Sequence, residues 1–259
     1  IAYLMGLSIG VHLLNLLAIP AVVLVYYFKK YKVNVKGSML ALLTSVVILG
    51  LVLYGLIPGF VVVASKFELF FVNTLGMSFN SGVYVYILIL VAAIVWSLYE
   101  SFTEKNYTRM AISYMLAVTL AGIPFIGENI FLGIVIIAGM VFFFFRKKKN
   151  ISARWLNTSM AMIAVMLIGY SSYSIIMIRS AAQPTMDQNS PDNIFALKSY
   201  LNREQYGDRP LIYGAVFSAP LKLDVQGNTC VPIADKTPIY CPKPKKDASE
   251  KDEYIVSGY

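Results

Sequence analysis

The sequence is poor in the residue types that carry most catalytic and metal chemistry. Its 259 residues include one histidine and two cysteines, and only 14% are charged, against about a quarter in an ordinary globular domain. His12 has no carboxylate close to it in the sequence, which argues against a metal site built around it. Cys230 and Cys241 do not form a CxxC pair, so the sequence does not support redox or zinc chemistry.

The chain is rich in apolar residues. They make up 58% of the chain, and the mean hydropathy is +0.65. This excess excludes a disordered chain, and the lack of a Gly/Pro repeat excludes a fibrous one. The composition indicates a membrane protein. A net charge of +8 and a pI near 9.3 leave nucleic-acid binding open until the charges are located.

The charges divide sharply at residue 180. Residues 1–179 carry 13 basic and 4 acidic side chains, a net charge of +9, whereas residues 180–259 carry 9 basic and 10 acidic side chains, a net charge of −1. The positive charge therefore belongs to the apolar part, where it occurs in short clusters between long apolar runs. This distribution argues against a nucleic-acid partner.

Long apolar segments predict an α-helical polytopic membrane domain over residues 1–179. A spanning helix needs about 20 mostly apolar residues, and none of the segments resembles a cleavable signal peptide. The segments are Ile1–Gly10, Leu13–Phe28, Ser38–Val61, Val83–Leu98, Met110–Pro124, Asn129–Phe145 and Trp155–Ile178. We predict about seven helices, the first of them truncated, followed by an incomplete extracytoplasmic region over residues 180–259.

Basic residues set the expected orientation. Eleven of them lie in alternate loops, at residues 29–36, 105–109 and 146–154. The other loops hold only Lys66, and Arg179 lies at the end of the last span. The positive-inside rule places the eleven in the cytoplasm. His12, the segment Gly59–Gly82 and the whole tail are then expected on the outer face of the membrane.

The first outer segment is a candidate for a site. Gly6 and Gly10 have the GxxxG spacing that permits close helix contact. His12 is an ionisable group near a span, and such groups suggest a site by default. The alternative is a histidine at a helix end that bonds to a carbonyl or to lipid headgroups.

The second outer segment, Gly59–Gly82, is too polar to span cleanly and too apolar for a free loop. It favours an amphipathic helix that lies in the outer interface. Lys66 and Glu68 would contact a phosphate and a hydroxyl, or would be solvated or snorkelling charges.

The tail predicts the start of an α/β domain. Asp192 or Asn193 is expected to cap a helix that runs to about Gln205. Its apolar side would consist of Phe195, Leu197, Tyr200 and Leu201. Leu211–Tyr213 and Lys222–Val225 favour short strands. Cys230 and Cys241 either pair in an oxidising compartment or remain unpaired.

Two stretches, Gly6–Pro20 (GLSIGVHLLNLLAIP) and Gln183–Gly214 (QPTMDQNSPDNIFALKSYLNREQYGDRPLIYG), resemble a family of bacterial multipass membrane proteins. The family is catalogued as domain of unknown function 2723, and its animal relative is transmembrane protein 260, a protein O-mannosyltransferase. The resemblance implies a C-type glycosyltransferase fold in the bacterial inner membrane, a polyprenyl-phosphate sugar donor and a protein acceptor. It also implies a catalytic carboxylate upstream of this sequence, which acts as a base or as a ligand to a divalent metal.

The same resemblance assigns two groups of residues. Gly6, Gly10, His12 and Asn15 would form an outer-face motif near the lipid-phosphate pocket, where the imidazole and amide donate to phosphate oxygens. A post-membrane motif would consist of Asp187, Asn189, Tyr200, Arg203, Glu204 and Tyr206. Arg203 would bind a phosphate or an acceptor carboxylate, unless the motif serves only to pack the tail on the membrane domain.

The leading hypothesis is therefore part of a membrane glycosyltransferase that moves a sugar, such as mannose, from a lipid-linked donor to a protein hydroxyl. The alternatives are a transporter or flippase-like protein and a noncatalytic membrane anchor. A transporter would need charged residues near mid-bilayer or broken helices in repeated halves. The sequence has no internal repeat, and the interiors of its spans are nearly free of charge.

Overall fold

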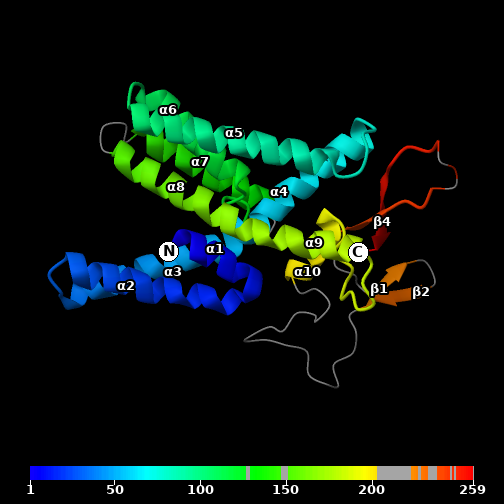
Figure 1. The fold of residues 1–259 in the computed structure, drawn as a ribbon, viewed down its shortest axis with the longest axis horizontal. Coiled ribbons are helices and arrows are strands. Elements are labelled where there is room, and N and C mark those ends of the chain that lie inside the picture. Colours follow the sequence, from blue (N-terminus) through cyan, green and yellow to red (C-terminus); the bar gives the residue numbers. More distant parts are fainter. Residues whose placement is uncertain are drawn as a thin grey trace, which may run out of the picture.

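The computed structural model describes residues 1–126, 129–146, 151–202, 223–226, 229–232, 238–245, 247 and 249–258. It is an elongated bundle of helices with short strands at one end (Figure 1). The α-helices are α1 (Ala2–Val11), α2 (Ala18–Lys30), α3 (Val35–Gly50), α4 (Ile57–Leu69), α5 (Ser81–Thr103), α6 (Tyr107–Leu120), α7 (Ile130–Arg146), α8 (Ala153–Tyr170), α9 (Ser174–Ala181) and α10 (Ile194–Asn202). Short 3-10 segments are η1 (Leu13–Leu17) and η5 (Ser171–Tyr173), and π-helical segments are η2 (Leu51–Leu56) and η3 (Phe70–Thr74).

The described residues include four helical stretches that are long and apolar enough to cross a membrane. They are Leu13–Lys30, Val35–Thr74, Ser81–Thr103 and Ala153–Ala181. The prediction of a multipass helical membrane protein is thereby confirmed in its coarse form. The expected spans at the chain start and after residue 129 correspond to the shorter apolar helices α1 and α7, so a count of seven spans stays a prediction.

One of these stretches differs from its predicted form. Helices α3, η2, α4 and η3 follow one another without a break over the 40 residues Val35–Thr74. At about 1.5 Å per residue this helix is roughly 60 Å long, about twice the thickness of a hydrocarbon core. The prediction of a separate interfacial helix over Gly59–Gly82 is therefore wrong. Pro58 lies at the start of α4, directly after the π-helical η2, where a local change of helix register accommodates its missing N–H.

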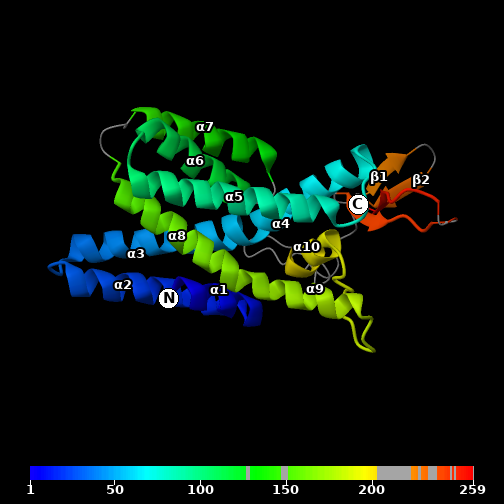
Figure 2. The same ribbon diagram turned by 45° about the horizontal axis from the view of Figure 1, so that its top comes forward.

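Close helix contacts are made through glycines. A Cβ atom at Gly6 would overlap the carbonyl oxygen of Met166 in α8, and one at Gly10 would lie 2.6 Å from the Ser172 hydroxyl oxygen. The close contact expected from the GxxxG spacing is therefore present, between α1 and the α8–η5 segment. Figure 2 shows α8 lying between the group α1–α3 and the group α5–α7, and α8 contacts both α1 and α5.

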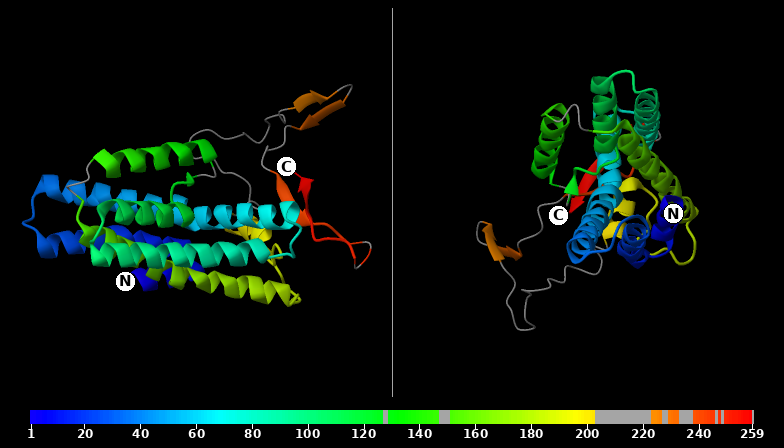
Figure 3. Two further views of the ribbon diagram at one scale, coloured as in Figure 1. Left: turned by 90° about the horizontal axis from the view of Figure 1, so that it is seen from above. Right: turned by 90° about the vertical axis from the view of Figure 1, so that its left-hand side faces the viewer.

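The basic connections between helices lie at one end of the bundle. The junctions α2–α3 and α5–α6, and the facing ends of α7 and α8, lie at one end, which we call the basic end because the clusters of lysine and arginine occur there (Figures 1 and 3). Helix α10 and the strands β3 (Ile239–Pro242) and β4 (Tyr254–Gly258) lie at the opposite end, the tail end. The basic loops of the sequence thus gather at the end of the bundle away from the tail.

In the part of the tail that the structure describes, helix α10 is followed by two antiparallel strand pairs. Asn193 caps α10, because its Oδ1 accepts hydrogen bonds from the N–H groups of Phe195 and Ala196, as the sequence predicts. Strand β1 (Leu223–Gln226) pairs with β2 (Thr229–Pro232), and β3 pairs with β4 in a register that opposes Tyr240 to Val256. Strand β1 corresponds to the strand predicted over Lys222–Val225. The predicted strand at 211–213 lies outside the described residues, and the α/β arrangement of the tail stays a prediction.

Candidate functional site

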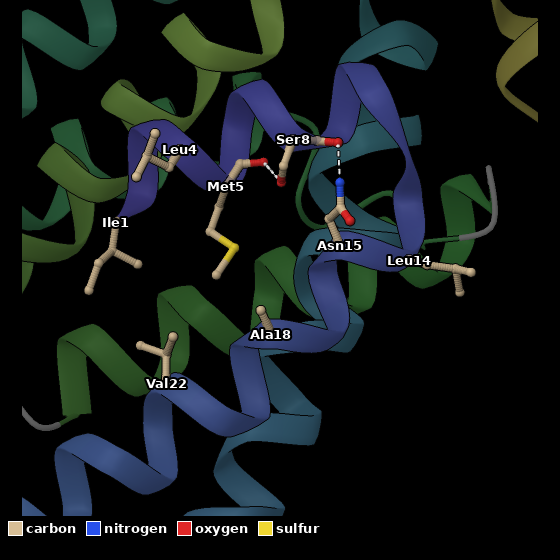
Figure 4. A pocket seen from close by; sticks show the side chains of 8 residues that line it. All are labelled: Ile1, Leu4, Met5, Ser8, Leu14, Asn15, Ala18 and Val22. Carbon is tan, nitrogen blue, oxygen red and sulfur yellow. Dashed lines mark hydrogen bonds between the residues drawn. The ribbon is translucent and has the colours of Figure 1, made fainter.

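The N-terminal helices form a mainly apolar cavity of about 510 Å³ that is open to the outside (Figure 4). It lies between α1 on one side and η1 with the start of α2 on the other. Its lining side chains are Ile1, Leu4, Met5, Ser8, Leu14, Asn15, Ala18 and Val22. An apolar wall with two polar groups suits an elongated apolar ligand that carries a polar head.

The two polar lining residues are tied to the same turn of α1. The Ser8 hydroxyl donates to the Met5 carbonyl oxygen over 2.8 Å, and the Asn15 amide nitrogen donates to the Ser8 carbonyl oxygen over 3.3 Å. Figure 4 shows Asn15 reaching from η1 toward Ser8. Because a carboxamide has two N–H bonds and a carbonyl oxygen, Asn15 keeps hydrogen-bonding capacity for a ligand.

His12 lies at the corner between α1 and η1 and is not part of the cavity lining. Its Nδ1 accepts a hydrogen bond from the Leu14 N–H over 3.1 Å, so the side chain caps η1. This geometry requires an unprotonated Nδ1, and the His12 side chain is exposed. The structure therefore supports the helix-end alternative for His12, while Gly6 and Gly10 lie against α8 and η5 and only Asn15 of the four predicted residues lines the cavity.

Sequence reasoning missed most of this lining. Leu4, Met5 and Ser8 share one face of α1 through their spacing of three and four residues, and Asn15, Ala18 and Val22 do the same on the next helical turns. This periodicity is the sequence pattern that could identify the lining residues. It does not stand out, because most of these residues are typical of any membrane helix.

The residues of the predicted post-membrane motif do not form one site within the described part of the chain. The Ser180 hydroxyl donates to Asp187 Oδ2 over 2.6 Å, which ties the connector back to the end of α9. Asn189 is exposed and has a left-handed backbone, with φ at 64°. Tyr200 is half-buried and packs against the main apolar core. Arg203, Glu204 and Tyr206 lie outside the described residues.

The predicted cysteine pair stays a prediction. Cys241, in β3, is a half-buried free thiol. Cys230 belongs to β2, but its side chain lies outside the part of the chain that the structure describes. The metal expected from the resemblance has no site of three or more His, Cys, Asp or Glu side chains among the described residues.

A buried carboxylate at the tail end corrects one sequence expectation. Lys66 is exposed, but Glu68 is completely buried at the end of α4 and is not a solvated or snorkelling charge. Its Oε1 accepts from the Asn80 N–H over 2.6 Å and its Oε2 from the Val83 N–H over 3.2 Å. Glu68 thus supplies a cap for α5, where a negative charge is favoured by the helix dipole.

One family model matches the segment of the chain that lines the cavity. The family model described as Protein O-mannosyl-transferase TMEM260 N-terminal domain matches residues 1–35. These residues comprise α1, η1, α2 and the first residue of α3, and they include all eight residues that line the cavity. The search of curated proteins and the search of solved structures each found no match.

Proposed function

We propose that the chain is part of a membrane glycosyltransferase of the O-mannosyltransferase type. It would move a sugar from a polyprenyl-phosphate donor to a hydroxyl of a protein acceptor on the outer face of the cytoplasmic membrane. The observation that carries this proposal is that the segment similar to the O-mannosyl-transferase domain is also the segment that builds the cavity.

The cavity has the chemistry that such a donor needs. Six of the eight lining side chains are apolar and suit the first isoprene units of a polyprenyl chain. Asn15 and Ser8 supply hydrogen-bonding groups for the phosphate. We propose that Asn15 binds the phosphate directly, and that His12, which is exposed at the neighbouring corner, offers its Nε2–H to the same headgroup.

The reaction also requires a base that removes the proton of the acceptor hydroxyl, together with donors that stabilise the leaving phosphate. The cavity lining contains no carboxylate. The buried carboxylates among the described residues, Glu68 and Glu100, are both held in hydrogen bonds within the helix bundle. The base is therefore proposed to come from outside the described site, as the family resemblance implies, and any divalent metal would be held there.

The orientation follows from the two ends of the bundle. With the basic end in the cytoplasm, the membrane region 1–179 would present the tail 180–259 to the outer side, where a protein acceptor is found. We propose that the post-membrane motif, including Asp187 and Tyr200, sets the path of the tail between the last membrane helix and α10.

The test is glycosyl transfer by the intact protein in native membranes, from a polyprenyl-phosphate mannose donor to a hydroxyl-containing peptide. Asn15→Ala should lower kcat/KM by about tenfold or more, since it removes a hydrogen bond to a charged phosphate. Val25→Ala, an exposed α2 residue outside the cavity lining, is the matched control and should retain activity. Substrate-dependent transport in liposomes without transfer would instead support the transporter alternative.

A further inference from the structure

The end of the long helix holds the backbone of a residue that is 181 positions away in the sequence. The Asn73 side chain, in η3, donates from Nδ2 to the Tyr254 carbonyl oxygen over 2.8 Å and accepts at Oδ1 from the Tyr254 N–H over 2.9 Å. The Asn73 carboxamide thus makes the two backbone hydrogen bonds to Tyr254 that a neighbouring strand would make. Because both backbone groups of one extended residue are bound, this contact selects an extended segment.

The side chain of the same residue is buried in a pocket of matching chemistry. The Tyr254 ring packs edge-on against Phe79, with ring centroids 4.8 Å apart, and against Phe195 of α10, with centroids 4.7 Å apart. Its hydroxyl donates to Glu68 Oε1 over 3.3 Å. Burial, followed by the nearby Glu68 carboxylate, raises the pKa of the Tyr254 hydroxyl, which keeps it protonated as a donor.

A second residue of the tail binds next to this pocket. Asp252 Oδ2 accepts from the Phe79 N–H over 3.1 Å, and its Oδ1 forms an ion pair with Lys245 at 2.6 Å. A polar cavity of about 400 Å³ lies between residues 72–76 of the helix end and residues 250–253 of the tail. The tail is therefore held here by directional contacts in addition to the packing of the buried Tyr254 ring in the main apolar core.

We propose that the helix end is a docking site for an extended segment with a tyrosine, and that the chain's own residues 252–254 occupy it as a latch between tail and membrane helices. Asn73 recognises the backbone, Glu68 the tyrosine hydroxyl, and the Phe79 N–H the carboxylate two residues earlier. The inference does not depend on the proposed glycosyl transfer, because it rests on contacts far from the cavity residues in the sequence.

Glu68 makes the latch a conformational device. A buried carboxylate needs several hydrogen-bond donors to offset its lost hydration. Two of its donors come from the first turn of α5 and its cap, and the third comes from the tail. The tail can therefore dock fully only when the corner between η3 and α5 is formed, so a movement of this corner would release the tail, and release of the tail would loosen the start of α5.

The experiment is amide hydrogen exchange, read by mass spectrometry, on the full chain in lipid nanodiscs. Asn73→Ala removes both backbone contacts, and exchange in peptides covering residues 250–258 should accelerate about tenfold. Tyr254→Phe keeps the ring and removes the hydroxyl, so exchange should accelerate severalfold both there and in residues 79–84. This shared response at the start of α5 is the signature of coupling through Glu68.

Lys243→Ala is the matched control. It removes an ion pair with Glu253 whose two side chains are about half exposed and which lies within the β3–β4 hairpin. Exchange at residues 79–84 should stay unchanged in this variant. If Asn73→Ala fails to fold, Tyr254→Phe carries the test alone. Unchanged exchange in both segments with Tyr254→Phe, or an equal response to Lys243→Ala, would overturn the latch.

Discussion

Two buried carboxylates, one toward each end of α5, are stabilised in different ways. At the basic end, Glu100 lies 2.6 Å from the guanidinium of Arg109 and also accepts from the indole N–H of Trp96. At the tail end, Glu68 is bound by two backbone N–H groups and a tyrosine hydroxyl. A cation on the next helix fixes a local helical hairpin at Glu100, whereas Glu68 binds neutral donors from the next helix and from the distant tail and so joins these two parts of the chain.

The two carboxylates have different kinds of partner because they lie in different surroundings. Glu100 has its partner nine residues away across the short α5–α6 connection, and that partner is 62% exposed at a surface rich in basic residues. Glu68 has no exposed face at all. The partial positive charge at the start of α5 therefore offsets the Glu68 charge, so no second ion has to be buried beside it.

The largest effect is expected from removing the carboxylate at the tail end. Glu68→Ala leaves the N–H groups of Asn80 and Val83 without partners in a buried setting and also leaves the Tyr254 hydroxyl unbound. The loss of unfolding free energy should be about 2–4 kcal/mol. Thermal unfolding in nanodiscs, followed by tryptophan fluorescence, measures it. A loss below 1 kcal/mol would show that the carboxylate is not the main support of this corner.

A smaller effect is expected at the basic end. Arg109→Ala removes the cation beside Glu100, but the arginine side chain is mostly exposed and water can replace part of its interaction. We expect a loss of about 1 kcal/mol. Arg109→Lys should recover part of it, since a lysine keeps the charge but not the fork of donors. If Arg109→Ala destabilised the protein more than Glu68→Ala, the comparison between the two ends would be reversed.

The smallest effect is expected from acid acting on the latch. The hydrogen bond from Lys245, and next the Phe79 N–H, lower the pKa of the Asp252 carboxyl below its usual value. A carboxyl with a lowered folded-state pKa stabilises the docked tail above its unfolded pKa near 4, and this contribution is lost as the pH falls through the folded value. Hydrogen exchange in residues 250–258, corrected for intrinsic rates, should therefore rise between pH 5 and pH 3. Asp252→Asn should flatten this profile, and a profile unchanged by that variant would remove Asp252 from the latch.

Local patterns made the sequence predictions that succeeded. Long apolar runs locate the membrane helices, the spacing of Gly6 and Gly10 predicts a close helix contact, and Asn193 is recognisable as a helix cap. Each of these depends on residues within one or two helical turns. The polar residues after Gly59 misled because polarity in a sequence suggests an interface, whereas here α10 packs against α4 and covers it.

The features that sequence reasoning could not reach depend on distant partners. Glu68 is buried because residues 12 and 186 positions away reach it, and no local spacing records that. The bond from the Leu14 N–H makes His12 a cap of η1, which the sequence did not indicate, and its binding of a phosphate stays a prediction. Of the lining residues, the sequence indicates only Asn15, because the apolar ones are indistinguishable in sequence from helix faces that contact lipid.

We propose above all that residues 1–35 bind a polyprenyl-phosphate sugar donor. The most direct measurement is photolabelling of the protein in nanodiscs with a polyprenyl phosphate that carries a diazirine near its headgroup, followed by peptide mapping. We expect label on the cavity residues of α1, η1 and α2, displaced by unlabelled polyprenyl-phosphate mannose and reduced in Asn15→Ala. Label spread evenly over the lipid-facing helices, or not displaced by the unlabelled donor, would contradict it.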